Sequence, residues 1–343
     1  MPADRHLTPH SERAKGSSIL LSLGVAIVVA ACAAGATPGS QGTSTPSATA
    51  VASPSPSPEP TQPPFPLTVR DDEGSEVTLA AVPRRIVSLS PANTEIVWAL
   101  GAGDRQAGGT DYDDFPAAAA ELPDVASYTG VDVERIVALE ADLVLAAGSG
   151  FNPPESIRRL RSLGIPVLVV DAAEVDAVRA DIELIGRAIG EWPAALALSA
   201  ALRERIEAIS AAAARSGTTP RTFYELDATN GIFGPAKDSV WAQMIELAGG
   251  VPITTDDPNV YAISLERLVA ADPEVIILGD AAYGVTPEIV AARPGWGGMS
   301  AVRDGAIYPV DDVIVTRPGP RIADGLLALA RAIHPDIPAD LGL

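Results

Sequence analysis

Histidine and cysteine, which carry out much of nucleophilic and metal-assisted catalysis, are scarce in this chain of 343 residues. The histidines are His6, His10 and His334, and the single cysteine is Cys32. His6 and His10 lie in a segment with the pattern of an export signal, so the mature chain would keep one histidine. This disfavours a Ser-His-Asp triad and a histidine-based metal site. One cysteine cannot form an intrachain disulfide.

Other catalytic signatures are missing from the sequence. It has no G-x-x-x-x-G-K-[ST] loop, and LGAGDRQAGG lacks the third glycine of a dinucleotide-binding fingerprint. The acidic turns DYDDFP and TTDDPN lack the spacing of a calcium loop. A net charge of −20 argues against nucleic acid as a partner, because that needs a basic surface. We predict no enzyme, no cofactor and no metal; a hydrolase that uses only carboxylates is the remaining catalytic alternative.

Binding chemistry is better represented than catalysis. Tyr112, Tyr128 and Tyr261 lie in polar loops rather than on periodic apolar faces. Tyrosine combines a wide apolar face with one hydroxyl at low entropic cost, which suits a large amphipathic ligand; loop packing is the alternative. Phe233 lies between Gly231 and Gly234, where another group can approach the backbone closely. Trp98 and Trp241 fall in amphipathic helices and are predicted to be core residues, whereas Trp296 is in a loop that lines either a cleft or the core.

The first 66 residues are not predicted to belong to the folded body. Arg13 and Lys15 precede an apolar run, Ile19 to Ala31, that is short for a membrane span. The run ends in VAAC, which resembles the bacterial lipobox, so we predict a signal peptide over 1–31 and lipidation of Cys32. An uncleaved signal anchor is the alternative. The Ser-, Thr- and Pro-rich stretch that completes 32–66 cannot bury a core and is predicted to be a disordered tether.

From Leu67 onward, short apolar strands alternate with helices. Residues 67–79 form two alternating runs around a turn, which indicates a hairpin. The following segments read as buried strands, RRIVSLS, ADLVLAA and IPVLVVD, with helices between them, which predicts βαβ units and a parallel sheet. A long helix follows, and then a second series of strands and helices. We predict an N-terminal lobe over 67–190, a bridging helix over 191–216 and a C-terminal lobe over 217–343, with a ligand cleft between the lobes.

The two lobes also share sequence. VERIVALEADLVLA, starting at Val133, recurs as LERLVAADPEVIIL, starting at Leu265, and EIVWALGAG is echoed by VWAQMIELAGG. The spacing of these echoes places about fifteen extra residues in the first lobe. Asp132 and Ser264 are predicted helix N-caps, which puts Glu134 and Glu266 in the first turn. A carboxylate there gains about 0.3–1 kcal/mol from the helix dipole.

RRIVSLSPANTEIVWALGAG, TDYDDFP and ASYTGVDVERIVALEADLVLA together resemble the iron-complex and cobalamin-binding proteins of bacterial ABC importers. The resemblance runs from about Leu67 to the C-terminus. It implies an α/β fold of two Rossmann-like lobes with parallel sheets, joined by a single long helix, as in class III periplasmic binding proteins. It also implies a ligand in the cleft and little hinge motion.

The resemblance carries specific expectations for site residues. Tyr112 falls on an aromatic residue that lines the cleft of cobalamin-binding members, and Tyr128 falls where these carry tryptophan. Phe233 and Tyr261 fall on aromatic residues of the second lobe. Asp312 and Arg321 occupy the region of the polar ligand contacts, with Arg317 as a competitor for the role of Arg321.

Two departures bear on the choice of ligand. Tyrosine replaces tryptophan at two of those aromatic positions, which reduces the flat surface for a corrin ring. Ser127 stands where related haem binders place their iron-ligating tyrosine, and this weakens the haem alternative. An ion pair of Arg321 with Asp311 or Asp312 is the alternative to its contact with ligand.

The repeated glutamates also have a role in the family. The resemblance implies that Glu134 and Glu266 dock to arginines of the two permease subunits, in addition to capping their helices. We therefore predict a lipid-anchored binding protein on the outer face of the bacterial cytoplasmic membrane. Its ligand would be cobalamin or another corrinoid, with a ferric siderophore and then haem as alternatives, and its partner an ABC permease dimer with its ATPase. A stand-alone extracellular adhesion or signalling module is the more distant alternative.

Overall fold

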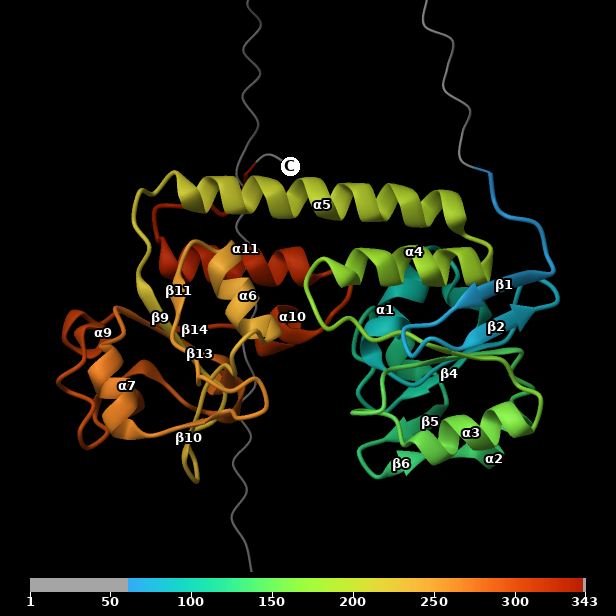
Figure 1. Cartoon of the computed structure of the whole chain (residues 1–343), viewed down its shortest axis with the longest axis horizontal. Helices are drawn as coiled ribbons and strands as arrows, with labels where there is room; N and C mark the ends of the chain where they lie inside the picture. The colour runs from blue at the N-terminus through green and yellow to red at the C-terminus, as the bar shows by residue number, and fades with distance from the viewer. Residues whose placement is uncertain (1–60, 342–343) are drawn as a thin grey trace, which may run out of the picture. The chain divides into compact units, whose positions relative to one another are not determined.

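A computed structural model of the chain describes residues 61–341, and these contain two separate parallel β-sheets (Figure 1). The export signal, Cys32 and most of the predicted tether lie outside the described residues. Within residues 61–341, no helix combines the length and the apolar character that a membrane span requires. We use "N-lobe" for residues 67–190 and "C-lobe" for residues 217–341.

The N-lobe is built on a six-stranded sheet of order β6-β5-β4-β3-β7-β8, parallel except for the pair β5 and β6. The interior strand β7 is buried along its whole length, as expected for a sheet covered on both faces. A hairpin of β1 and β2 precedes the sheet, as predicted. The strands are β1 (Leu67–Arg70), β2 (Glu76–Leu79), β3 (Ile86–Ser88), β4 (Gln106–Thr110), β5 (Asp124–Ser127), β6 (Gly130–Val131), β7 (Leu143–Ala146) and β8 (Val167–Val169). The helices are α1 (Pro91–Ala99), α2 (Val133–Ala138), α3 (Pro154–Ser162) and α4 (Ala177–Ile189), with 3₁₀ turns η1 (Gly103–Arg105) and η2 (Ala117–Glu121).

The C-lobe is built on a four-stranded parallel sheet of order β11-β9-β13-β14, with a small antiparallel pair, β10 and β12, beside it. Its strands are β9 (Arg221–Glu225), β10 (Ile232–Phe233), β11 (Val251–Pro252), β12 (Ala262–Ile263), β13 (Val275–Leu278) and β14 (Ile307–Pro309). Its helices are α6 (Val240–Leu247), α7 (Leu265–Ala271), α8 (Pro287–Ala291), α9 (Ser300–Asp304), α10 (Asp312–Thr316) and α11 (Ile322–Ile333), with the 3₁₀ turn η3 (Gly279–Tyr283).

The sequence echo corresponds to a repeated topology. The order β4-β3-β7-β8 in the N-lobe matches β11-β9-β13-β14 in the C-lobe, and the N-lobe adds β5 and β6 at one edge. The predicted N-caps are confirmed: Asp132 accepts a hydrogen bond from the Arg135 amide at 2.9 Å, and Ser264 accepts one from the Arg267 amide at 3.2 Å. The repeated helices α2 and α7 therefore begin in the same way at equivalent places in the two sheets.

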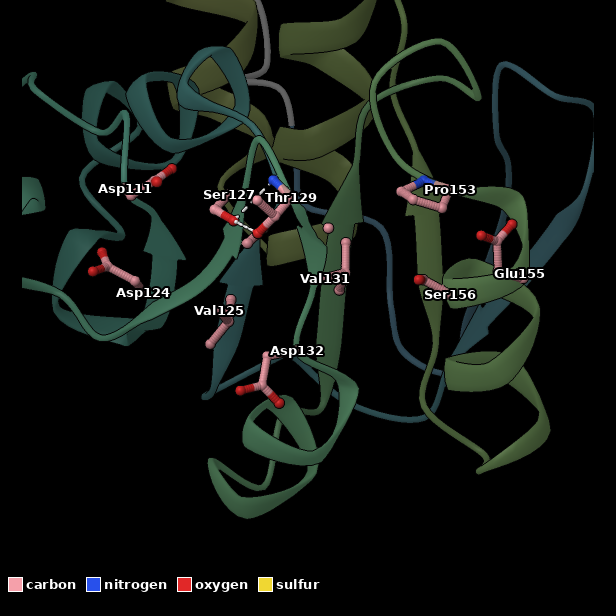
Figure 2. A pocket seen from close by; sticks show the side chains of 12 residues that line it. Asp111, Asp124, Val125, Ser127, Thr129, Val131, Asp132, Pro153, Glu155 and Ser156 are labelled. Atoms are coloured by element: carbon pink, nitrogen blue, oxygen red, sulfur yellow. Dashed lines mark hydrogen bonds between the residues drawn. The ribbon is translucent and has the colours of Figure 1, made fainter.

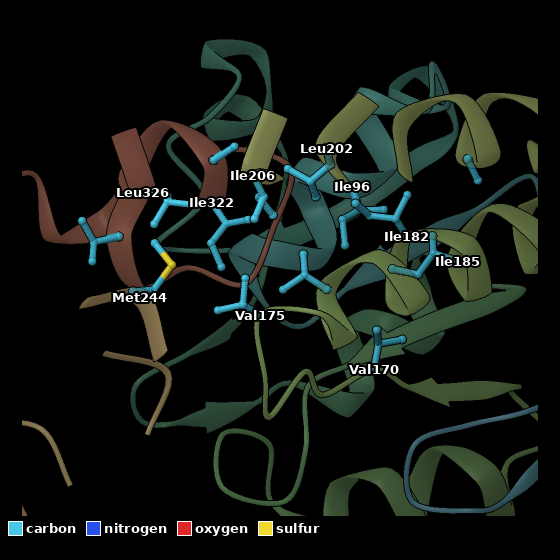
Figure 3. Close-up of a cluster of buried hydrophobic side chains, with 14 of the residues drawn as sticks. Ile96, Val170, Val175, Ile182, Ile185, Leu202, Ile206, Met244, Ile322 and Leu326 are labelled. Atoms are coloured by element: carbon cyan, nitrogen blue, oxygen red, sulfur yellow. The ribbon is translucent and has the colours of Figure 1, made fainter. Parts of the chain in front are cut away.

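One long helix, α5 (Trp192–Ala214), connects the two halves. It packs against α4 and α11, beside which it runs in Figure 1. Leu202 and Ile206 of α5 join a single apolar cluster that contains Ile96 and Ile182 from the N-lobe and Leu326 from the C-lobe (Figure 3). The predicted α/β fold, with two parallel sheets and one long connecting helix, is confirmed. The lobes share one core where they meet α5.

The residues just before the N-lobe contact the folded body. Gln62 donates to the Arg187 carbonyl at 3.2 Å and accepts from the Trp192 amide at 3.0 Å. Phe65 packs against the shared core. The last residues that the sequence assigned to the tether are therefore attached near the junction of α4 and α5.

Candidate ligand-binding site

A cavity of about 340 Å³ lies between the lobes, at the carboxyl edge of the N-lobe sheet. The carboxyl ends of parallel strands are a common place for ligand sites in α/β folds. Ser90, Ala147 and Asp171, which follow β3, β7 and β8, line the cavity from the N-lobe. Trp241, Thr316, Arg317 and Pro318 line it from the C-lobe.

Two aromatic side chains contribute to the cavity wall. Phe151 lies in the loop after β7 and is 80% exposed. Trp241, from α6, makes an edge-to-face contact with Tyr261, with ring centroids 5.8 Å apart. Tyr261 thus contacts a residue of the cavity wall but does not line the cavity itself. Phe233 pairs with Ala262 between β10 and β12, next to Tyr261, and is half-buried.

The polar lining of the cavity is acidic and includes a buried amide. Asn93, in the first turn of α1, is only 2% exposed, and its Nδ2 has no hydrogen-bond partner. Asp181 of α4 is also buried. Burial, followed by the negative charges of Asp72 and Asp171, raises the pKa of Asp181 to about 8. The cavity therefore holds a carboxyl that keeps its proton at neutral pH.

Asp171 is an exposed residue of this wall. A Cβ built on Gly148 would lie 1.8 Å from an Asp171 carboxylate oxygen, so a side chain at this position would displace that of Asp171. The Asp171 backbone amide donates to the Asp72 carboxylate at 2.7 Å. The loops after β7 and β8 thus meet at the wall that also contains the buried Asp181.

The protonated state of Asp181 predicts a dependence of stability on pH. The folded state holds a proton that the unfolded state has released, so the free energy of unfolding should fall as pH rises from about 4 to about 8. Asp181→Asn should remove this contribution and raise the melting temperature relative to wild type more at pH 8 than near pH 5. Calorimetry at both pH values is the measurement. An equal difference in melting temperature between variant and wild type at pH 5 and at pH 8 would show that Asp181 is already ionised in the folded protein at pH 5.

The predicted arginines take part in an ion-pair network between the lobes. Arg321 donates to Glu95 at 2.9 Å and 2.6 Å, and Arg317 donates to the same carboxylate at 2.7 Å. Glu95 belongs to α1 and its side chain is only 2% exposed. Hydrogen bonds to Glu95 raise the pKa of Arg321. The salt-bridge partners of Arg321 are therefore Glu95 and, at 4.0 Å, Asp114, rather than Asp311 or Asp312 as considered from the sequence.

A second carboxylate and an aromatic ring complete this network. Asp114 accepts from Arg317 at 2.5 Å. The Arg321 guanidinium lies 4.2 Å from the centroid of the Phe115 ring, in a cation–π contact. Both Asp114 and Phe115 belong to the turn that contains Tyr112, so the network fixes the turn that follows β4.

Asp312 is held by residues of its own lobe. Its carboxylate accepts a hydrogen bond from the buried Tyr224 hydroxyl at 2.7 Å. Burial raises the pKa of Asp312 despite this bond. Thr316, one helical turn later, donates to the Asp312 carbonyl at 2.8 Å and lines the cavity. Asp312 therefore lies close behind the wall, and its contact with ligand stays a prediction.

A second, more open hollow of about 640 Å³ lies on the N-lobe, and Figure 2 shows its lining. Ser127 and Thr129 lie side by side in its wall, joined by a hydrogen bond of 2.7 Å, and the start of α3 forms another side. Four carboxylates give it an acidic lining: Asp111, Asp124, Asp132 and Glu155. Tyr112 and Tyr128, the sequence neighbours of its lining residues, are 56% and 88% exposed. Both predicted tyrosines of the N-lobe are thus open to solvent beside this hollow.

The glutamates predicted to dock to a partner are also exposed. Glu134 lies in the first turn of α2 and Glu266 in the first turn of α7. No hydrogen bond or ion pair that involves either side chain is seen among the described residues. Both carboxylates are therefore available at the surface.

Sequence reasoning missed several cavity residues. Trp241 was predicted to be core, but it also lines the cavity. Asn93 and Phe151 were not singled out, although Phe151 follows a buried strand in a glycine-rich loop, a position typical of ligand contacts. Trp296 is 3% exposed and stacks with Arg293 at 4.7 Å, so it belongs to the core and not to a cleft rim.

Comparisons with known proteins agree on one family. A family model described as "Periplasmic binding protein" matches residues 86–313. The ABC transporter substrate-binding lipoprotein YvrC of Bacillus subtilis is 33% identical over 276 residues, which cover 79% of this chain and 87% of that protein. A vitamin B12-binding protein of Yersinia pseudotuberculosis is 32% identical over 200 residues, 58% of this chain and 70% of that protein. The apo structure of the periplasmic haem-binding protein RhuT from Roseiflexus sp. RS-1 superposes with a TM-score of 0.65 and 26% identity, covering 74% of this chain and 98% of that one.

Proposed function

Because the chain belongs to the periplasmic binding protein family, we propose that it captures a corrinoid outside the cytoplasm and delivers it to an ABC import permease. The observation that carries this proposal is the cavity between the lobes, with aromatic side chains in and beside its wall. A binding protein needs a concave, partly apolar site with a few polar groups, and it needs no nucleophile or base.

One relative favours a corrinoid, and the charge of the cavity lining disfavours haem. A vitamin B12-binding protein is among the relatives, at 32% identity. Haem is the second candidate because the fold is similar to that of a haem-binding protein. The acidic lining disfavours it, since haem carries two carboxylates that would meet Asp171. A ferric siderophore remains the alternative from the sequence.

The aromatic residues predict how affinity depends on single side chains. Replacing Tyr112, Tyr128 or Tyr261 by alanine should weaken binding by about 1–3 kcal/mol each if the ring stacks on a buried ligand. Titration of cyanocobalamin by calorimetry is the measurement. The matched Tyr→Phe variants keep the ring and should retain most of the affinity. If wild type gives no heat and no shift in melting temperature at high cyanocobalamin concentration, the corrinoid is wrong and siderophores become the leading ligand class.

We extend the proposal to a lipid anchor on Cys32 and to two docking residues, Glu134 and Glu266. VAAC at the end of the apolar run supports lipidation, and the name of the Bacillus relative includes the word lipoprotein. The mass of the mature N-terminal peptide tests it, because an unmodified Cys32 would exclude the anchor. The matching position of the two glutamates at the start of α2 and α7 supports docking to a partner with two similar subunits.

A further inference from the structure

The described cavity lining contains two buried donors without a hydrogen-bond partner, Asn93 Nδ2 and Trp241 Nε1, and the Asn93 amide is the one on the N-lobe side, where Asp171 also lies. The backbone amide of Asn93 donates to the Ser90 hydroxyl at 3.3 Å, which holds the residue in the first turn of α1. Its side-chain Nδ2 donates to nothing. An unsatisfied buried donor costs free energy, so a ligand acceptor that satisfied it would bind more tightly.

The charges around the cavity favour neutral groups over anions. Arg317 is the cation in the described lining, and its guanidinium already binds Glu95 at 2.7 Å and Asp114 at 2.5 Å. Asp171 and Asp181 face the cavity without a matching cation of their own. Burial, followed by the negative charges of Asp72 and Asp171, raises the pKa of Asp181, and both causes would also disfavour a further negative charge in the cavity.

The size of the cavity limits which part of a ligand can enter. A volume of about 340 Å³ is at the lower end of the range for small-molecule sites, so it accommodates a side arm of a macrocycle rather than the ring. Phe151 and Trp241 give apolar surface around the stem of such an arm. Asn93 and Asp171 then offer a donor and an acceptor to its end.

On the premise that the ligand is a corrinoid, we propose that the inter-lobe cavity binds a neutral carboxamide side arm through Asn93 and Asp171 and excludes a carboxylate. A primary carboxamide has a carbonyl oxygen to accept from Asn93 Nδ2 and an N–H to donate to the Asp171 carboxylate. A carboxylate lacks the donor and adds a charge next to Asp171. The cavity would thereby favour macrocycles whose side arms end in carboxamides over those whose side arms end in carboxylates.

The test compares two corrinoids that have the same ring but different groups at the ends of their side arms. Calorimetry measures the affinities of wild type for dicyanocobinamide, which carries carboxamides, and for the corresponding cobyrinic acid, which carries carboxylates. We expect the amide to bind about 100-fold more tightly, since each lost or repelled contact is worth about tenfold. Asn93→Ala should weaken the binding of dicyanocobinamide about tenfold and leave the affinity for cobyrinic acid unchanged.

Replacement of the acceptor, Asp171, is expected to strengthen binding of the acid. Asp171→Asn should lower the ratio of the affinity for dicyanocobinamide to that for cobyrinic acid about tenfold. The affinity for the acid should rise because the repelling charge is removed. Asp176→Asn, an exposed carboxylate outside this cavity, is the matched control and should leave the ratio unchanged. If Asn93→Ala does not fold, the wild-type ratio and Asp171→Asn still decide the question.

The outcomes separate the inference from the proposed function. Equal affinity of wild type for the two corrinoids would overturn the carboxamide inference and leave the corrinoid ligand standing. An unchanged ratio in Asp171→Asn would also overturn the inference. Binding of neither corrinoid would overturn the corrinoid ligand itself, and the inference with it.

Discussion

A variant that carries Glu134→Gln and Glu266→Gln together should lose nearly all uptake of ligand while its ligand affinity stays at the wild-type value. Both glutamates are exposed, in the first turns of α2 and α7, at equivalent places in the two lobes. Gln keeps the size of the side chain, so folding should lose only the helix-dipole contribution, under about 1 kcal/mol at each site. An interfacial charge pair can be worth more than that, because its loss leaves the partner's charge unpaired.

The control is Glu288→Gln. Glu288 is also an exposed glutamate in a first helical turn, but it belongs to α8, which is not part of the repeated pair. It should change stability by a similar small amount and leave uptake intact. Uptake and melting temperature are measured on the same variants. Lower stability with unchanged transport per folded molecule would show that the repeated glutamates only cap their helices.

Glu95→Ala should lower the free energy of unfolding by about 3 kcal/mol, toward the lower end of the range for breaking a buried ion pair. The Glu95 side chain is 2% exposed and accepts from both Arg317 and Arg321, so its loss leaves two guanidinium groups without their main partner. The lower end applies because these arginines are 14% and 22% exposed and water can partly solvate them. Equilibrium unfolding in urea measures the difference.

The matched control is the exposed ion pair between Arg205 and Asp324. It has the same 2.6 Å separation as the Arg321–Glu95 pair, but its side chains are 39% and 42% exposed. Asp324→Ala should therefore cost less than about 1 kcal/mol. If Glu95→Ala costs no more than Asp324→Ala, burial does not strengthen the network, and the lobes are held together by the apolar core alone.

The fold could be predicted because its signals are local. Strands such as LVLA in β7 are continuous apolar runs, and helices α2 and α7 begin at residues whose side chains cap them. The repeated sequence alone indicates two equivalent lobes, without information on how the strands pair. The extra residues of the first lobe appear as β5 and β6 at one sheet edge.

The cavity could be predicted only in part, because its contacts join residues far apart in the chain. Arg321 and Glu95 are separated by 226 positions, so no spacing in the sequence could identify the pair. Trp241 has the apolar pattern of a core residue because one side of its ring does pack against the core. Asn93 was missed because an asparagine next to a helix start is common and its lack of a partner becomes visible only in three dimensions.

The shared core beneath α5 has a consequence for the kinetics of release. Moving the lobes apart would disrupt this cluster, to which the N-lobe contributes Ile182, α5 contributes Leu202 and the C-lobe contributes Leu326. Burial of each side chain of this size contributes about 1.5–3 kcal/mol. We therefore expect spontaneous widening of the cleft to be a rare event, and a ligand held there to dissociate slowly when the protein is alone. A partner that held one lobe at each of two fixed points could supply the work of separating them. The rate of ligand release would then be set by the partner and its energy source rather than by the affinity of the cavity.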